Sequence, residues 1–528
     1  MSTLIYDTLI VPGASVPTHD GAIGLDGIAT LANLAAITAI TTPYKRAFMQ
    51  RTALDTGITY ELQADLATWI SMQGGGDSRT AWSVNSATGV NTAFGDAGAP
   101  LLTLKELVRR WTHGGRGRQK TSTNTCTVTI DGNPGLTDPF NPQLLLAGDG
   151  KLVVKGTPVV ARSGTIATFT AINEAAGTED IAQITDGGIA SWTGDKNKRI
   201  KITTAGARFG ATAWIAGAYS AGVGAVSQFT KATQFSETLV TPIAGDTYDI
   251  ETLPQIVMGG FDAVGDDNST SFTFCSVIFQ DLTIGDNTTF VPVAPRTGSN
   301  VIVSYLGCKF LTPLNQQGGE LYSFGCNFVN GFNIKNTQGR IFSCLGNGAS
   351  AFAYHIIQDG AQTTIGHASI FWAGGGILIY GNGAVVNHGL QVHNTATSLL
   401  NPSGDGICLG KSSSTYDRMV GGGFMVVAPE AGVAGASKLL GRSNAGVGIR
   451  MGATSRLSVE STSVLGITGA GGDFRAGNSA LSLVNVDPTT NATAAGIDQT
   501  WANFAAARAA GFGGVVINPS TQTVIVTQ

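Results

Sequence analysis

From Ser299 to Gly383 the sequence breaks into successive units of similar length, and each unit ends in a polar turn closed by glycine. The closing glycines are Gly318, Gly339, Gly360 and Gly383, so their spacing is nearly constant. Each unit holds three short stretches of β character, such as 301–304 and 377–380, which are too short for an amphipathic helix. One such unit cannot bury its apolar side chains, whereas stacked units share a continuous core and a ladder of backbone hydrogen bonds. The pattern predicts a right-handed parallel β-helix, an all-β solenoid.

The composition fits this prediction. Of 528 residues 72 are glycine and 12% are charged, against about 7% and about 25% in an average protein. Glycine supplies the positive φ angles of sharp corners. With 43% hydrophobic residues and a net charge of −4, the chain can bury a core beneath a surface that is polar but weakly charged. Such a surface suits contacts with sugars or proteins and argues against an electrostatic nucleic-acid binder.

A β-sandwich or a propeller is the alternative fold. Either would favour longer alternating strands joined by hairpin turns such as Asn-Gly, and Asn382-Gly383 is one of few such pairs in this region. A second, shorter spacing also occurs, because the sequence Gly-Cys-Lys-Phe at 307–310 recurs as Gly-Cys-Asn-Phe at 325–328. The two spacings differ, so the coils differ in loop length and the sequence does not fix their register.

The six cysteines are few for a chain of this length, and none forms a CxxC pair that would indicate zinc. They are Cys126, Cys275, Cys308, Cys326, Cys344 and Cys408. Their even number permits disulfides, but we expect buried thiols, because the segment 1–17 lacks the basic and apolar stretches of a secretion signal. No run approaches the ~18 apolar residues of a membrane span. We therefore expect a soluble protein made in the cytoplasm, without membrane insertion.

Five regions are predicted. They are an N-terminal attachment region of mixed helix and strand patterns (1–78), a first β-helix unit with a capping helix (79–158), an inserted small β domain with longer alternating strands (159–254), the β-helix itself (255–487), and a C-terminal helix and strand cap (488–528). The capping helix is expected to begin at Thr103, with Glu106 completing a capping box, and to end at Trp111. In the C-terminal cap we expect an Ala-rich helix at 500–510, followed by two strands around Asn518-Pro519.

The order of a strand, a Gly/Asp loop, Ala99-Pro100, the helix at 103–111 and glycine-cornered coils resembles the pectate-lyase-like β-helix superfamily. Within it, the likeness is to bacteriophage tailspike and tail-fibre proteins. It covers about 79–158 and 255–487 and includes no diagnostic catalytic sequence. The resemblance implies a homotrimer in the virion, attached to other virion proteins by its N-terminal region. It also implies that the β-helix binds, and in many relatives cleaves, the polysaccharide of the host surface.

Glycoside cleavage needs two carboxylates about 5–5.5 Å or about 6.5–9.5 Å apart, and stacked coils about 4.8 Å apart provide such pairs easily. The candidates are Asp262, Asp266, Asp267, Asp281, Asp286, Glu320, Asp359 and Asp405. Most of them adjoin glycine or asparagine in turns, where aspartate is favoured because its side chain caps the local backbone. We therefore assign no catalytic residue.

Histidine gives a sharper pattern, since four of the six lie between 355 and 393. His367 and His388 are separated by one coil of the glycine spacing, so they are expected to stack on one face. The predicted substrate-binding residues of a shallow carbohydrate groove are His355, His367, Trp372, Tyr380 and His388. The alternative is that these side chains form part of the solenoid wall. No HxH or HExxH spacing occurs, so neither a metal site nor a cofactor is predicted.

The segment 114–121 superficially resembles a phosphate-binding loop, but Gln119 stands before Lys120 where the motif has glycine, and no strand immediately precedes it. We reject that interpretation. The densest basic run comprises Arg109, Arg110, His113, Arg116, Arg118 and Lys120. It is interpreted as a solvated loop, or else as a contact for an acidic partner protein.

Three functions follow from the sequence. The first is a structural virion protein, a tailspike or fibre that attaches to host surface glycans. The second is a polysaccharide depolymerase, a glycosidase or lyase, on the same fold. The third is a bacterial surface adhesin.

Overall fold

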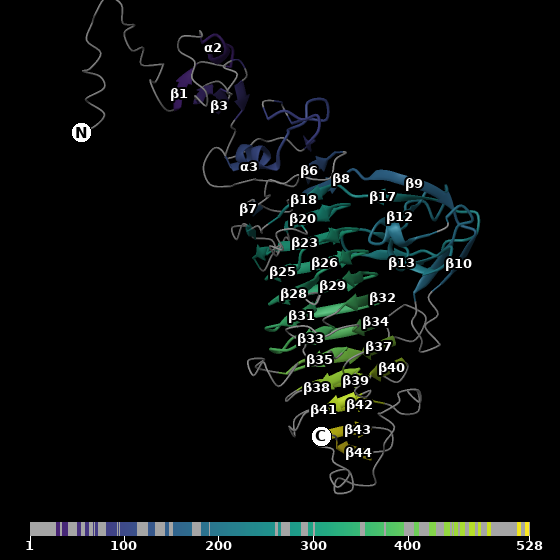
Figure 1. Ribbon diagram of the computed structural model, residues 1–528. Coiled ribbons are helices and arrows are strands. Elements are labelled where there is room, and N and C mark those ends of the chain that lie inside the picture. Colours follow the sequence, from purple (N-terminus) through teal and green to yellow (C-terminus); the bar gives the residue numbers. More distant parts are fainter. Residues whose placement is uncertain are drawn as a thin grey trace, which may run out of the picture.

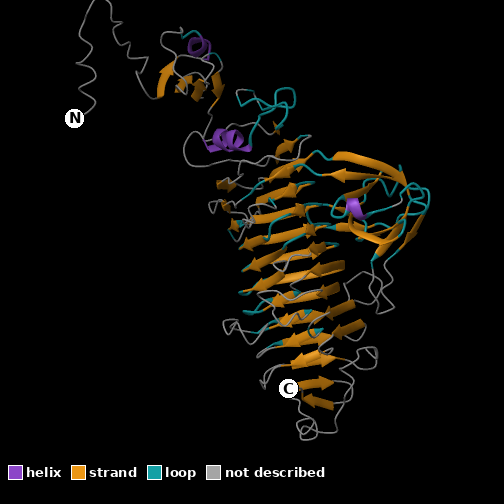
Figure 2. Ribbon diagram, in the orientation of Figure 1, coloured by secondary structure: helices purple, strands orange, loops and turns teal. Residues whose placement is uncertain are grey.

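The computed structural model describes most of the chain between residues 28 and 526. The described residues are 28–31, 34–40, 50–53, 59–62, 67, 69–71, 81–91, 93, 95–112, 125–131, 143–146, 151–171, 181–189, 191–258, 262–265, 275–286, 294–298, 301–348, 354–373, 376–394, 406–410, 422–428, 438–443, 446, 448–451, 455–459, 464–469, 474–476, 483–486, 515–518 and 523–526. The largest group of strands is stacked coil upon coil in one long column (Figure 2).

The strands of the column pair in parallel and form three faces of a β-helix (Figure 1). The first face contains β5 (Ala81–Val84), β6 (Thr125–Ile130), β8 (Lys151–Gly156), β20 (Cys275–Gln280), β23 (Val301–Leu306), β26 (Glu320–Phe324), β29 (Gln338–Phe342), β36 (Phe424–Val427), β39 (Arg456–Val459) and β42 (Leu483–Val486). The second face contains β18 (Gln255–Ile256), β21 (Thr283–Ile284), β24 (Lys309–Phe310), β27 (Asn327–Phe328), β30 (Leu345–Gly348), β37 (Lys438–Ser443) and β40 (Val464–Gly469).

Two long strands, β32 (Gln362–Ala373) and β34 (Ala384–Asn394), run through both of these faces. The third face contains β7 (Gln143–Leu146), β19 (Asp262–Gly265), β22 (Arg296–Thr297), β25 (Leu314–Gln317), β28 (Gly331–Lys335), β31 (Tyr354–Gln358), β33 (Ile377–Ile379), β35 (Ile407–Leu409), β38 (Ile449–Met451) and β41 (Phe474–Ala476). The predicted parallel β-helix is confirmed.

The coils differ in length. Ile302 pairs with Glu320 and Glu320 pairs with Gln338, so these two successive coils are short and equally long. Farther along, Ala384 pairs with Phe424, so that coil is more than twice as long. The faces keep their strands in register while the loops between them vary, which is typical of solenoids.

The predicted glycine spacing is wrong as a coil register. Gly339 lies inside β29 and pairs with Leu321 of β26, not with Gly318. Gly318 lies in the corner before β26 at a φ of 77°. The spacing from Gly318 to Gly339 therefore joins a glycine at a corner to a glycine within a strand, since glycine occurs in both places.

The Gly-Cys repeat, at 307–308 and 325–326, marks the corner between the first and second faces. Four stacked residues there adopt the left-handed conformation: Asp281 (φ 56°), Gly307 (58°), Gly325 (58°) and Ser343 (51°). Each donates its backbone N–H to the coil that follows, as Gly307 does to the carbonyl of Phe324 at 3.0 Å. This geometry turns the chain sharply while the ladder continues, and glycine adopts it without a steric penalty.

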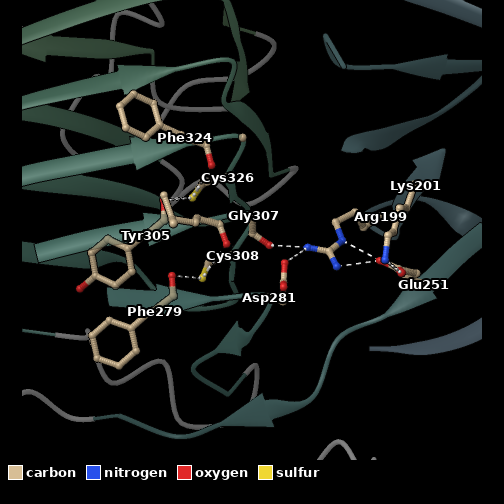
Figure 3. Close-up of polar contacts among 12 residues, drawn as sticks. Arg199, Lys201, Glu251, Phe279, Asp281, Tyr305, Gly307, Cys308, Phe324 and Cys326 are labelled. Atoms are coloured by element: carbon tan, nitrogen blue, oxygen red, sulfur yellow. Dashed lines mark hydrogen bonds and ion pairs between the residues drawn. The ribbon is translucent and has the colours of Figure 1, made fainter. Parts of the chain in front are cut away.

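The residue after each left-handed corner points into the core, and three of these residues are cysteines. Cys308 and Cys326 donate their thiols to the carbonyls of Phe279 and Tyr305 at 3.3 and 3.2 Å (Figure 3). Burial raises the pKa of both thiols well above the usual value. The five cysteines whose side chains the structure describes are all buried free thiols, as expected from the sequence.

The interior of the column is a single apolar core. Aromatic rings follow one another through successive coils, with Phe279 stacked on Tyr305 and Phe310 on Phe328 at centroid distances of 5.4 and 5.0 Å. At the N-terminal end of the column, α3 (Leu104–Thr112) adds Leu104 and Leu107 to this core (Figure 1).

The Thr103 half of the predicted capping box is confirmed, since the backbone N–H of Glu106 donates to Thr103 Oγ1 at 3.1 Å. The backbone N–H of Thr103 donates to Asn91 Oδ1 at 3.2 Å. The helix covers apolar surface that the first coil leaves open, as caps of solenoids must. Among the basic residues around it, 113–120 lie outside the described residues, and so does the helix expected at 500–510.

Between β8 and β18 the chain leaves the column and builds a second sheet system. Its strands are β9 (Val159–Thr165), β10 (Thr168–Thr170), β11 (Ala182–Thr185), β12 (Arg199–Ile202), β13 (Thr212–Ser220), β14 (Val223–Val226), β15 (Thr230–Ala232), β16 (Glu237–Leu239) and β17 (Thr247–Thr252), with a 3-10 turn at Thr193–Asp195. They pair antiparallel around their own core, which includes Trp192, Phe229 and Tyr248. We call residues 159–252 the inserted sheet domain.

The two ends of the chain carry smaller elements. Near the N-terminus, β1 (Ile28–Leu31), β2 (Gln50–Ala53), β3 (Thr59–Leu62) and β4 (Trp69–Ser71) form a separate sheet with α2 (Leu34–Thr38). At the other end, β43 (Val515–Asn518) continues the first face beside β42. β44 (Thr523–Val526) pairs antiparallel with β43, so the expected strand pair around Asn518 is present.

Candidate functional site

The inserted sheet domain lies against the corner between the first and second faces, beside the coils of β20 to β29 (Figure 1). Arg199 of β12 forms the polar centre of this contact. It donates Nε and Nη2 to Glu251 of its own domain at 2.9 and 2.7 Å, and Nη1 to Asp281 of the column (Figure 3). Burial alone would lower the pKa of Arg199, but Asp281 and Glu251 outweigh it and raise the pKa.

Further contacts connect the inserted sheet domain to successive coils. Trp214 donates its indole N–H to the carbonyl of Gly325 at 2.6 Å and is 1% exposed. Ser343 of the next coil donates to Glu237 at 2.8 Å. The domain is therefore held at a corner whose backbone is defined by the left-handed residues.

The turn between β15 and β16 extends from this corner over the first face. Gln234 donates to Ser276 of β20 at 2.6 Å, and Phe235 packs edge-on against Tyr322 of β26 at a centroid distance of 5.6 Å. Phe235 is 47% exposed, so it remains accessible to a ligand. The turn ends where an open groove on the first face begins.

This groove has a volume of about 350 Å³ and crosses β26, β29, β32 and β34. The side chains that line it are mainly polar, and they include Glu320, Tyr322, Gln338, Arg340, Gln362 and Thr364. Glu320, Gln338 and Gln362 are stacked in register on successive coils, as are Tyr322, Arg340 and Thr364. Alternate residues of each strand point outwards, so the two ladders lie side by side. We call this site the first-face groove.

Tyr322 is the aromatic centre of the first-face groove. Its hydroxyl donates to Glu320 at 3.0 Å, and the guanidinium of Arg340 lies 6.0 Å from its ring centroid. Burial and the neighbouring Glu320 carboxylate raise the pKa of Tyr322, so the hydroxyl stays protonated at neutral pH. The ring is thus fixed by three neighbours while remaining only half-buried.

The chemistry of the first-face groove matches a polar, ring-shaped ligand. Two amides, a guanidinium, a carboxylate and the hydroxyls of Tyr322 and Thr364 offer both donors and acceptors, and Tyr322 adds an apolar ring face. Glu320 is the one carboxylate among the described residues that line it. Glycoside cleavage by the two-carboxylate route requires a second. The lining supplies the groups for binding and half of the pair for that cleavage.

The predicted substrate-binding residues lie on all three faces instead of in one groove. His388 lies in β34 on the first face, with Nδ1 2.6 Å from the carbonyl of Ala428. Trp372 lies in the second-face part of β32, in register with Asn347 and His393. Tyr380 follows β33 on the third face and packs on the cluster of Ile356, Leu378 and Cys408.

The expected stacking of His367 on His388 is wrong by one position. His388 pairs with Gly366, and His367 lies in the register shift between Gly366 and Ser369, at the corner between two faces. The prediction that His355 binds substrate is also wrong, because its side chain is 0% exposed and packs on Phe332 at a centroid distance of 4.6 Å. A side chain inside the column cannot touch a surface glycan.

The burial of His355 has a measurable consequence. Burial lowers its pKa to about 3, whereas an unfolded histidine titrates near 6.5. Below pH ~6.5 His355 becomes protonated in the unfolded chain but stays neutral in the folded chain. Its contribution to the free energy of unfolding is therefore complete above pH ~6.5 and is lost as the pH falls towards 3. Between pH 6.5 and 5 we expect His355 to lower the free energy of unfolding by about 2 kcal/mol.

Urea unfolding at pH 7 and pH 5 tests this effect. His355→Leu should reduce the pH dependence of the unfolding free energy relative to the wild type, whatever it does to stability at pH 7. An identical pH dependence in both proteins would contradict a neutral, buried His355.

Two of the candidate carboxylates are corner residues, as the turn interpretation predicts. Asp281 and Asp359 have φ angles of 56° and 52°, and each pairs with a base, Arg199 and Lys335 respectively. Glu320 lines the first-face groove, and Asp281 lines a second cavity beside Arg199. The side chain of Asp262 and the whole of Asp266, Asp267 and Asp405 lie outside the described part of the chain.

Sequence reasoning missed Tyr322, Arg340, Gln338 and Phe235. The available signal was the spacing of the Gly-Cys repeat, since Glu320 and Gln338 are separated by one coil of that length. Within the described residues, no group of three or more His, Cys, Asp or Glu side chains is arranged to hold a metal ion. In the same residues, no helix has the length and apolar character to cross a membrane.

No family model and no curated protein matches the chain. Two solved structures are similar to it. One is the tailspike protein gp49 from Pseudomonas phage LKA1, with 9% identity, a TM-score of 0.23, and coverage of 72% of this chain and 73% of that one. The other is the Gp54 tailspike of Acinetobacter baumannii bacteriophage AP22 in complex with A. baumannii capsular saccharide, with 8% identity, a TM-score of 0.18, and coverage of 70% and 67%. Both are phage tailspikes, the group that the sequence resembles, and at these scores no residue's role passes to this chain.

Proposed function

We propose that this protein is a virion spike that attaches to a host surface polysaccharide, and that the first-face groove binds the saccharide. The observation that carries the proposal is the groove itself, where Tyr322 is flanked by ladders of hydrogen-bonding side chains and bordered by Phe235. A long, weakly charged column with such a groove offers an extended surface to a repeating polymer. A homotrimer, joined to the particle through residues 1–78, completes the proposal.

Loss of glycan binding on mutation of the groove tests this function. Tyr322→Ala removes the ring and the hydroxyl that donates to Glu320. We expect at least a tenfold weaker affinity for the host polysaccharide, by analogy with aromatic residues that dominate binding at protein interfaces. Glycan arrays identify a binding polysaccharide, and biolayer interferometry then measures the affinity.

Tyr219→Ala is the matched control, because Tyr219 lies in β13 of the inserted sheet domain, is 53% exposed and does not line the groove. Equal affinities for Tyr322→Ala and Tyr219→Ala would exclude the first-face groove as the binding site.

Depolymerisation is the second candidate, favoured by the position of Glu320 beside Tyr322. Incubation with the polysaccharide that the protein binds distinguishes depolymerisation from attachment alone. If the wild type releases oligosaccharides and Glu320→Gln does not, the protein is an enzyme. Binding without release fits an attachment protein.

A further inference from the structure

A second cavity lies at the seam between the inserted sheet domain and the column. It has a volume of about 240 Å³. The column contributes Lys155, Gln280 and Leu306, which are in register on β8, β20 and β23. The inserted sheet domain contributes Lys201 and Thr212, which pair across β12 and β13. We call it the seam pocket.

The seam pocket carries an excess of positive charge. Its cations are Lys155, Arg199 and Lys201, and the carboxylates among and beside them are Asp281 and Glu251. Arg199 already engages both carboxylates, and Lys201 is only 3.6 Å from Glu251. Within the part of the chain that the structure describes, Lys155 takes part in no ion pair, and its side chain is exposed at the mouth of the cavity.

The size and lining of the seam pocket limit the kinds of ligand that it can bind. A water molecule occupies about 30 Å³, so the cavity has room for several waters, and therefore for a sugar ring as well as a small inorganic ion. Thr212 and Gln280 offer hydroxyl and amide groups to hydroxyls of the ligand, while the unpaired ammonium of Lys155 favours a negative charge.

The turn between β15 and β16 connects the two cavities. Ala232, at the end of β15, lines the seam pocket, and Phe235, in the turn that follows, packs against Tyr322 of the first-face groove. Leu306 in the seam pocket pairs with Phe324 on β26, the strand that also carries Tyr322. A polymer lying in the groove therefore passes close to the seam pocket.

We propose that the seam pocket binds the carboxylate of an acidic sugar residue, so that the glycan recognised by this protein contains uronic or similar acids. This inference rests on the proposed function and specifies its glycan class. Lys155 is the specificity-determining residue, and Lys201 assists it.

Titration of the full-length protein with sodium glucuronate, methyl glucoside and sodium sulfate, followed by isothermal calorimetry or saturation-transfer NMR, tests the proposal. Glucuronate should bind, with methyl glucoside and sulfate at least tenfold weaker. Lys155→Gln should weaken glucuronate binding about tenfold or more, the size expected for one charge-assisted hydrogen bond. Lys151→Gln, on the same strand but outside the pocket, should leave it unchanged.

The proposal is overturned if Lys155→Gln binds glucuronate as the wild type does, or if sulfate binds as tightly as glucuronate. Tyr322→Ala separates this result from the proposed function. Glucuronate binding that depends on Lys155 and persists in Tyr322→Ala supports the seam pocket even where the polysaccharide test at the first-face groove fails.

Discussion

Arg199→Ala should lower the free energy of unfolding by about 3–5 kcal/mol. The Arg199 side chain is 3% exposed and neutralises Glu251 at 5% exposure and Asp281 at 18%. Its removal leaves Asp281 without this cation and Glu251 with Lys201 alone, at 3.6 Å, and the cost of a poorly compensated buried charge exceeds the value of the pair itself. Because Asp281 belongs to the column and Glu251 to the inserted sheet domain, the loss also loosens the contact between them. Urea unfolding followed by circular dichroism measures the change.

An exposed ion pair provides the control. Lys335 and Asp359 lie 2.7 Å apart on the column, with side chains 43% and 40% exposed. Lys335→Ala should therefore cost at most about 1 kcal/mol, since solvent screens such pairs. Similar losses for Arg199→Ala and Lys335→Ala would show that Arg199 is not a buried connection between the two units.

Phe310→Ala should cost about 3–5 kcal/mol through the cavity it leaves. Phe310 is 0% exposed, stacks on Phe328 of the next coil with an interplanar angle of 14°, and meets Tyr305 at a centroid distance of 4.9 Å. Ile284 of the preceding coil and Phe328 of the next coil are in register with Phe310 and are held by their own strands, so the core cannot collapse into the space. Thermal and urea unfolding measure the loss.

Phe209→Ala is the comparison for this substitution, because Phe209 is 55% exposed. A change within about 0.5 kcal/mol is expected there. If Phe310→Ala were equally mild, the ring stack would not be a close-packed core, and the stacking of coils described above would be wrong.

The fold class could be predicted from the sequence because the corners of the β-helix produce a local sequence pattern. Gly307 and Gly325 recur at the true coil length, since the left-handed corner favours glycine and the next position favours a small buried side chain such as Cys308. The longer spacing from Gly318 to Gly339 predicted a wrong coil register, because glycine also occurs within strands and the loops vary in length. Helix α3 was predictable from Thr103 and Glu106, since capping is local.

The candidate groove was not predictable from sequence for a physical reason. Its lining residues come from four coils and face one another only once the register is known, and a one-residue slip exchanges inward and outward side chains. The histidines illustrate this effect, because His355 points into the core and His388 lies opposite Gly366. Phe235 reaches the groove through a tertiary contact of the inserted sheet domain, for which no periodic pattern exists.

The central claim is that host saccharide lies in the first-face groove, on the ring of Tyr322 and beside the β15–β16 turn. A crystal structure of the protein with an oligosaccharide of the polysaccharide it binds is the most direct measurement. We predict sugar density over Tyr322, within hydrogen-bonding distance of Gln338, Arg340 or Gln362. Density confined to the second or third face, for example beside Trp372 or Tyr380, would contradict it.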